Sequence, residues 1–191
     1  MACVMQMEEI SPEAVEHGQL LAAAELLCRV WPKPGRTPES RVEAALSELR
    51  AYDGPHNQRP RSFLLREQGK AIAHASIVSR EIILGSERVV VAGLARVCTA
   101  PEQRGRGLGE LVVHAAFETI DRGDFPWALF QTNTSVRPFY ERLGSALVEN
   151  RIVNSRGDDS EANPFWDEVV MRYPNRPDWP AGTIDLLGPG Y

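Results

Sequence analysis

The residues best suited to chemistry lie in one short stretch, 97–111, which reads Val-Cys-Thr-Ala-Pro-Glu-Gln-Arg-Gly-Arg-Gly-Leu-Gly-Glu-Leu. Its pattern predicts the end of a strand, a loop and the first turn of a helix. Glycine has no Cβ, so Gly105, Gly107 and Gly109 let main-chain N–H groups approach a bulky ligand closely. A helix start adds N–H donors without partners at the positive end of the dipole. We therefore expect a cradle for a phosphate or pyrophosphate, with two arginines at its rim.

Two common phosphate-binding motifs fit this loop poorly. A Walker loop ends in Gly-Lys-Ser/Thr, which is absent here. A dinucleotide fingerprint has Gly-x-Gly-x-x-Gly directly after a strand, and an acid closes the next strand. Here the spacing is Gly-x-Gly-x-Gly, and the next predicted strand runs into Gln131 and Asn133. A glycine turn that only joins a strand to a helix is the remaining alternative without a ligand.

A second motif relates the loop to a known family. Asn133 is followed at 139–144 by Phe-Tyr-Glu-Arg-Leu-Gly. In the loop, Arg104, Gly107 and Gly109 meet the pattern Gln/Arg-x-x-Gly-x-Gly/Ala. The loop followed by this second motif resembles the GNAT superfamily of acyl-CoA-dependent N-acyltransferases. The resemblance is firm over about residues 89–148 and weaker outside them.

The resemblance implies acetyl-CoA as the acyl donor. It implies that the main chain of Val97, Cys98 and Thr99 pairs with pantetheine, much as an added strand would. The residues expected around the diphosphate are Arg104, Gly105, Arg106, Gly107, Leu108 and Gly109. A main-chain N–H near a bulge in the same strand would stabilise the negative charge of a tetrahedral intermediate.

Three further side chains have candidate roles. Tyr140 matches the general acid of many relatives, and its phenol can protonate a leaving thiolate; the alternative is an aromatic packed on the core. Asn133 matches the asparagine that contacts the cofactor, and it could equally cap a helix. Cys98 has no evident base beside it, so a buried inert thiol is favoured over a nucleophile.

The general base is not evident from the sequence. Many relatives carry a glutamate in the strand before the loop, but 89–97 holds no carboxylate, and Glu81 and Glu87 lie near the preceding turn. Ordered water could relay the proton. Alternatively, the proline-rich and glycine-rich tail 174–191 could fold back and present the terminal carboxylate of Tyr191, or it could pack elsewhere.

The acceptor is an amine of unspecified kind. The segments that line the acceptor site in relatives carry several acids here, which favours a small cationic amine such as an aminoglycoside or polyamine; a solvated acidic surface is the alternative. These acids are Glu39, Glu43, Asp53, Asp158, Asp159 and Glu161. A protein or peptide acetyltransferase, and a non-catalytic acyl-CoA-binding sensor, stay open as other functions.

Bulk composition sets the remaining expectations. The 191 residues suffice for one domain over 1–191, and the net charge of −5 does not favour nucleic-acid or anionic-membrane binding. Three cysteines and four histidines are scattered, so neither a disulfide framework nor a metal site is expected. Without a signal or transmembrane pattern the expected location is the cytoplasm, and a homodimer is compatible with the sequence.

The resemblance implies an α/β fold of the GNAT type, which would position the loop at 97–111 and the motif at 133–144. We expect a mixed central sheet of about seven strands flanked by about four helices. The predicted strands are 2–7, 62–67, 71–84, 88–99, 127–131, 146–153 and 166–173, and helices begin at 11–13, 37–39, 107 and 134. The early strands should form an antiparallel meander, with a bulge or close approach at Gly93. The strands 88–99 and 127–131 should form a parallel pair that is splayed at the cofactor site.

Overall fold

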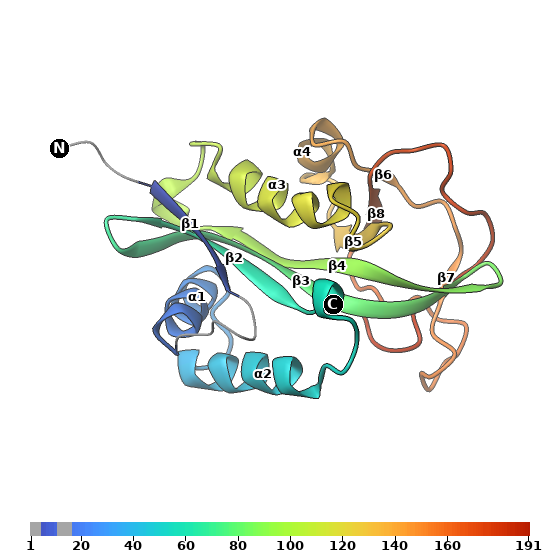
Figure 1. Ribbon diagram of the computed structural model, residues 1–191, viewed down its shortest axis with the longest axis horizontal. Helices are drawn as coiled ribbons and strands as arrows, with labels where there is room; N and C mark the ends of the chain where they lie inside the picture. The colour runs from blue at the N-terminus through green and yellow to red at the C-terminus, as the bar shows by residue number, and fades with distance from the viewer. Residues whose placement is uncertain (1–4, 11–16) are drawn as a thin grey trace. The chain divides into compact units, whose positions relative to one another are not determined.

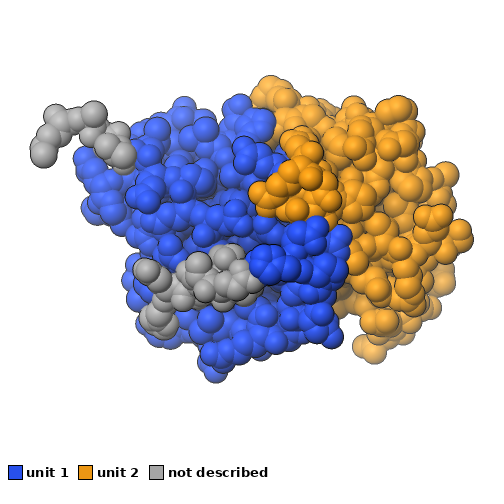
Figure 2. All heavy atoms as spheres, viewed as in Figure 1, with its two compact units in different colours: residues 1–78, 94–118 blue, residues 79–93, 119–191 orange. Residues whose placement is uncertain are grey.

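The computed structural model describes residues 5–10 and 17–191, which form two compact units of interleaved segments. Unit 1 comprises residues 1–78 and 94–118, and unit 2 comprises residues 79–93 and 119–191 (Figure 2). The elements that pass from one unit to the other are β3 (Lys70–Leu84), β4 (Glu87–Thr99) and α3 (Leu108–Asp121). The helix start predicted at 11–13 lies outside the described residues, and one domain over the whole chain stays a prediction.

Unit 1 contains the predicted meander, in the strand order β1-β2-β3-β4. Its first two strands are β1 (Met5–Ile10) and β2 (Arg61–Glu67). The pairs β1–β2 and β2–β3 are antiparallel. Gln68 and Gly69 form the predicted tight turn, and both have positive φ (51° and 76°), which suits a two-residue hairpin. β1 extends to Ile10, beyond the predicted end at 7.

Two helices cover one side of this meander. They are α1 (His17–Val30) and α2 (Pro38–Ala51), and the short 3₁₀ turn η1 (His56–Gln58) follows them. Thr37 and Ser40 form a reciprocal capping box that starts α2, with Pro38 in its first turn. Apolar side chains of both helices pack with Leu64, Cys98 and other strand residues in one core cluster. Figure 1 shows α1 and α2 together on one side of the strands and α3 on the other.

Helix α3 follows the candidate loop directly. It comes after the 3₁₀ turn η2 (Pro101–Gln103) and ends before Gly123, whose φ of +88° is typical of a residue just past a helix. Its buried residues recur at helical spacing: Leu108, Val112, Val113, Ala116, Phe117 and Ile120. The helix predicted from 107 is thereby confirmed.

Unit 2 continues the sheet in the order β4-β5-β8-β6. Its further elements are β5 (Ala128–Thr132), α4 (Arg137–Arg142), β6 (Ala146–Leu147), β7 (Ile152–Val153), β8 (Val169–Tyr173) and β9 (Ile184–Asp185). β4 and β5 are parallel, at Ala92–Ala128 and Gly93–Leu129, as predicted for a strand–helix–strand crossover. The other pairs of β5, β6 and β8 are antiparallel.

The mixed α/β fold of the GNAT type is confirmed, with some differences in detail. The described residues form nine strands and four α-helices. The predicted strand 146–153 is two short strands, β6 and β7, because its two ends pair with β8 and β9 respectively. The bulge or close approach predicted at Gly93 stays a prediction: Gly93 pairs with Leu129, and the residue of β4 with positive φ is Arg96 (φ 54°).

Candidate active site

The loop after β4 has the form of an anion cradle. Gly105 and Gly107 have φ of +79° and +75°, and a Cβ on either would meet no atom within 4 Å. In the described part of the chain, the N–H groups of Gly105, Gly107, Leu108 and Gly109 have no hydrogen-bond acceptor. Four donors at the start of a helix, beside open space, suit a phosphate or diphosphate. The observed loop therefore has the donors and the open space that a phosphate or diphosphate needs.

The two arginines of the loop differ in their surroundings. The Arg106 guanidinium makes two hydrogen bonds to the Glu67 carboxylate, of 2.8 and 3.0 Å, and another to Gln103. The exposed Arg104 has no side-chain partner among residues 5–10 and 17–191. Arg104 is therefore the arginine available for an anion, whereas Arg106 ties the loop to β2.

Strand β4 has an irregular turn of backbone just before Val97. Arg96 adopts positive φ, which is rare for a residue with a long side chain. Two buried side chains of β3 bond the adjoining carbonyls: Ser76 Oγ donates to Ala95 O at 3.0 Å, and His74 Nδ1 bonds to Arg96 O at 2.9 Å. These bonds stabilise the left-handed residue, since they satisfy carbonyls that a regular ladder would otherwise use.

Cys98 has the environment of an inert thiol. Its side chain is buried in the core cluster with α1 and α2, and burial raises the pKa of the thiol to about 12. A thiol with a raised pKa carries little thiolate near neutral pH, and thiolate is the nucleophilic form. The structure therefore supports the inert thiol over covalent catalysis by Cys98.

In unit 2, Tyr140 is buried on α4 against Phe130 and Phe139, at ring-centroid distances of 4.7 and 4.9 Å. Its hydroxyl has no hydrogen-bond partner among the described residues, and burial raises its pKa above the ordinary value. Asn133 Oδ1 accepts from the N–H of Val136 at 3.0 Å in the turn before α4, but the N-cap of α4 is Val136, so Asn133 does not cap this helix. Its amide nitrogen is left to contact a cofactor.

Two of the candidate base residues, Glu81 and Tyr191, make contacts within unit 2. Glu81 pairs with Arg88. The main-chain oxygen of Tyr191 accepts from Gln131 Nε2 at 2.8 Å, and the Tyr191 hydroxyl donates to Leu129 O at 3.0 Å. The tail pairs with β3 and β7 through β9. These contacts fix Tyr191 at β5 within unit 2.

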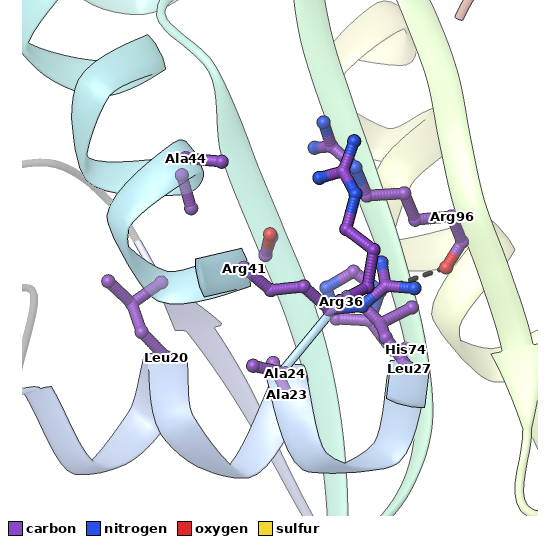
Figure 3. Close-up of a pocket in the computed structure, with 11 residues that line it drawn as sticks. Leu20, Ala23, Ala24, Leu27, Arg36, Arg41, Ala44, His74 and Arg96 are labelled. Atoms are coloured by element: carbon purple, nitrogen blue, oxygen red, sulfur yellow. Dashed lines mark hydrogen bonds between the residues drawn. The ribbon is translucent and has the colours of Figure 1, made fainter. Parts of the chain in front are cut away.

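Sequence reasoning missed a pocket in unit 1. It has a volume of about 70 Å³ and is lined by α1, α2 and three strands. Its polar side chains are Arg36, Arg41, Ser62, His74 and Arg96. Figure 3 shows how Arg36, Arg41, His74 and Arg96 lie in the pocket. No local pattern marks this pocket, because its residues come from six separate segments: α1, the stretch before α2, α2 and three strands. The one signal in the sequence was His74, a histidine between two alanines in a predicted strand, which could have indicated a polar site.

The predicted acids do not line that pocket. In unit 1, Glu39, Glu43 and Asp53 are exposed. In unit 2, Asp158, Asp159 and Glu161 are exposed as well, and Glu161 pairs with Arg151. Within the described ranges, no group of three or more His, Cys, Asp or Glu could hold a metal ion. No helix in those ranges is long and apolar enough to cross a membrane.

Comparison with known proteins agrees with this geometry. Residues 12–148 match the sequence model of the acetyltransferase (GNAT) domain, whereas no curated protein matches the chain. A GCN5-related N-acetyltransferase from Kribbella flavida shares 24% identity at a TM-score of 0.57, over 75% of this chain and 33% of that one. This chain thus spans about a third of that protein's length.

Two further solved structures are similar over nearly their whole length. An acetyltransferase from Trypanosoma brucei has a TM-score of 0.60 and 19% identity, over 77% of this chain and 96% of that one. A GNAT family acetyltransferase from Brucella melitensis, in complex with acetyl-CoA, has a TM-score of 0.58 and 15% identity, over 96% of each chain. At 15–19% sequence identity, the similarity to these two structures shows that the fold is shared and nothing further.

Proposed function

Because this chain belongs to the GNAT acetyltransferase family, we propose that it transfers the acetyl group of acetyl-CoA to the primary amine of a small acceptor. One observation carries the proposal: the unpartnered N–H groups of Gly105, Gly107, Leu108 and Gly109 at the start of α3. They supply what a diphosphate needs, and Arg104 adds a free charge beside them. Arg106 would act by holding the loop on β2.

The donor would lie along β4. Val97, Cys98 and Thr99 would pair with pantetheine through their main chain, which their half-buried or buried position at the end of the strand supports. The left-handed residue Arg96 turns the backbone just before this segment. A main-chain N–H at this turn would donate to the thioester oxygen as it becomes negative.

The reaction would proceed by direct attack. The neutral amine attacks the carbonyl carbon of the thioester, a tetrahedral intermediate forms, and the carbon–sulfur bond breaks to give an amide and a thiolate. Tyr140 would donate its proton to that thiolate, and the unpartnered, protonated phenol supports this role. Asn133 would contact the cofactor through its amide nitrogen.

The amine must lose a proton before or during the attack. β4 has no carboxylate after Glu87 at its start. We assign the proton transfer to water relayed along the strand, since Tyr191 is bound to Gln131 and Leu129. The small cationic amine that the acidic residues of the sequence favour stays a prediction.

Calorimetry and a thiol-release assay on the full chain test the proposal. We expect saturable binding of acetyl-CoA, and CoA thiol release that depends on added amine. Absence of acetyl-CoA binding would overturn the donor site. Binding without release for any small amine or peptide would instead favour an acyl-CoA sensor. Release with peptides alone would favour a peptide acetyltransferase. A cytoplasmic location and a homodimer stay predictions from the sequence.

A further inference from the structure

The pocket in unit 1 has an apolar wall and a basic mouth. Helix α1 contributes Leu20, Ala24 and Leu27 to the wall. The arginines come from three different segments: Arg36 precedes α2, Arg41 lies in its first turns, and Arg96 lies on β4. Figure 3 shows these three side chains gathered around His74. Cationic groups converge here although the chain as a whole carries a net charge of −5.

The positive charge of the pocket is only partly compensated. Arg96 pairs with Glu48 at 2.9 Å. Arg41 reaches the Trp31 carbonyl at 3.4 Å, and its Nε is buried without a hydrogen-bond partner. The Arg36 guanidinium has no partner in the described part of the chain. A single carboxylate therefore faces three guanidinium groups, and several N–H donors lack acceptors.

His74 adds no charge to the pocket. Its Nδ1 lies 2.9 Å from the Arg96 carbonyl, so this nitrogen carries the proton and Nε2 is the unprotonated one. The ring is buried, and burial together with the Arg96 charge favours its neutral form. The donors available to an incoming group are thus the arginines and the Ser62 hydroxyl.

We propose that this pocket binds the anionic group, a carboxylate or a phosphate, of the amine acceptor. A volume of about 70 Å³ holds one such group and excludes a large cation. Forked guanidinium donors match the paired oxygens of both anions. Arg96 is the residue before Val97, so an acceptor held here lies beside the segment to which we assigned pantetheine. In this respect the inference rests on the proposed function.

Anion binding is tested first, without turnover. Inorganic phosphate and 2-aminoethyl phosphate are titrated calorimetrically into the full chain saturated with CoA, so that the loop before α3 is filled. We expect one site, at which Arg36→Ala weakens binding at least tenfold. The matched control is Arg50→Ala, an exposed arginine at the end of α2 that does not line the pocket, and it should leave binding unchanged. Absence of binding, or equal binding by both variants, would overturn the inference.

Turnover then separates this inference from the proposed function. β-Alanine, its uncharged amide, 2-aminoethyl phosphate and putrescine are compared as acceptors by thiol release. We expect at least tenfold higher kcat/KM for the anionic amines, through KM, and loss of that preference in Arg36→Ala. The ratio of β-alanine to 2-aminoethyl phosphate distinguishes a carboxylate from a phosphate site. Equal turnover of the uncharged or dicationic amines would overturn the inference and leave the transferase standing. Anion binding at this pocket without turnover of any amine would overturn the transferase and leave the anion site standing.

Discussion

Arg106 and Glu67 form a two-armed ion pair between the candidate loop and β2, with Nη2–Oε1 at 2.8 Å and Nη1–Oε2 at 3.0 Å. The carboxylate side chain is 15% exposed and the arginine 41%. Arg104, two residues earlier, has no comparable partner among the described residues. The two arginines of the loop therefore differ in what they can offer a ligand.

We expect Arg104→Ala to weaken acetyl-CoA binding about tenfold, because a hydrogen bond to a charged group contributes roughly 1.5–3 kcal/mol. Arg106→Ala should instead lower the free energy of unfolding by up to about 1 kcal/mol and affect binding less. Calorimetry and urea unfolding of both variants measure the two effects. Equal losses of affinity would show that both arginines reach the donor.

Gly107→Glu should abolish acetyl-CoA binding while the protein still folds. A Cβ at Gly107 meets no atom within 4 Å, and the positive φ costs about 1–2 kcal/mol. The carboxylate would occupy the cradle and repel the diphosphate. Gly123→Glu is the matched control, since Gly123 also has positive φ and open space but lies at the other end of α3. Unchanged affinity in Gly107→Glu would contradict the placement of the diphosphate.

Tyr140→Phe should lower kcat about 100-fold and leave acetyl-CoA affinity and melting temperature nearly unchanged. The ring contacts with Phe130 and Phe139 are retained, and the lost hydroxyl has no partner in the described residues. Because burial raises the Tyr140 pKa, the wild-type phenol stays protonated and kcat should not decline below about pH 10. Tyr173→Phe, which loses a bond to Asp121, should reduce stability but not kcat. Equal kcat in Tyr140→Phe would remove this residue as the acid.

The loop and its helix could be predicted because their signals are local. Glycine spacing, a strand before it and apolar residues at helical spacing after it all lie within 97–122. The same holds for α2, where Thr37, Pro38 and Ser40 supply a cap within one turn. Such features depend on neighbouring residues and hardly on the rest of the fold.

The missed features depend on distant partners. Arg96 adopts positive φ next to two hydrogen bonds from β3, in which His74 and Ser76 bond the carbonyls of Arg96 and Ala95. From the sequence alone, Gly93 was the residue of this strand expected to have irregular backbone. The segment 146–153 reads as one strand, yet its end pairs with β9 from the tail. The predicted strand 166–173 begins only at Val169, because Gln131 Oε1 binds the preceding N–H groups of Trp166 and Asp167. Long-range hydrogen bonds of this kind leave no periodic signal.

His74 should make the stability of the protein depend on pH between about 4 and 6.5. Burial lowers its pKa from 6.5 to about 4, so between these values the unfolded chain binds a proton that the folded chain does not. Stability from this residue is therefore complete above pH 6.5 and is lost as the pH falls towards 4, by about 3 kcal/mol in all.

Urea unfolding of wild type and His74→Gln across this range measures the effect, since Gln can still donate to the Arg96 carbonyl but does not titrate. The variant should lose less stability on acidification than the wild type. His114→Gln is the comparison variant, because it removes a histidine whose side chain is 53% exposed rather than buried. Parallel curves for wild type and His74→Gln would mean that this ring is protonated as readily in the folded protein as in the unfolded chain. The neutral state that we assigned to the His74 ring would then be wrong, whereas the anion site, which depends on the arginines, would not be affected.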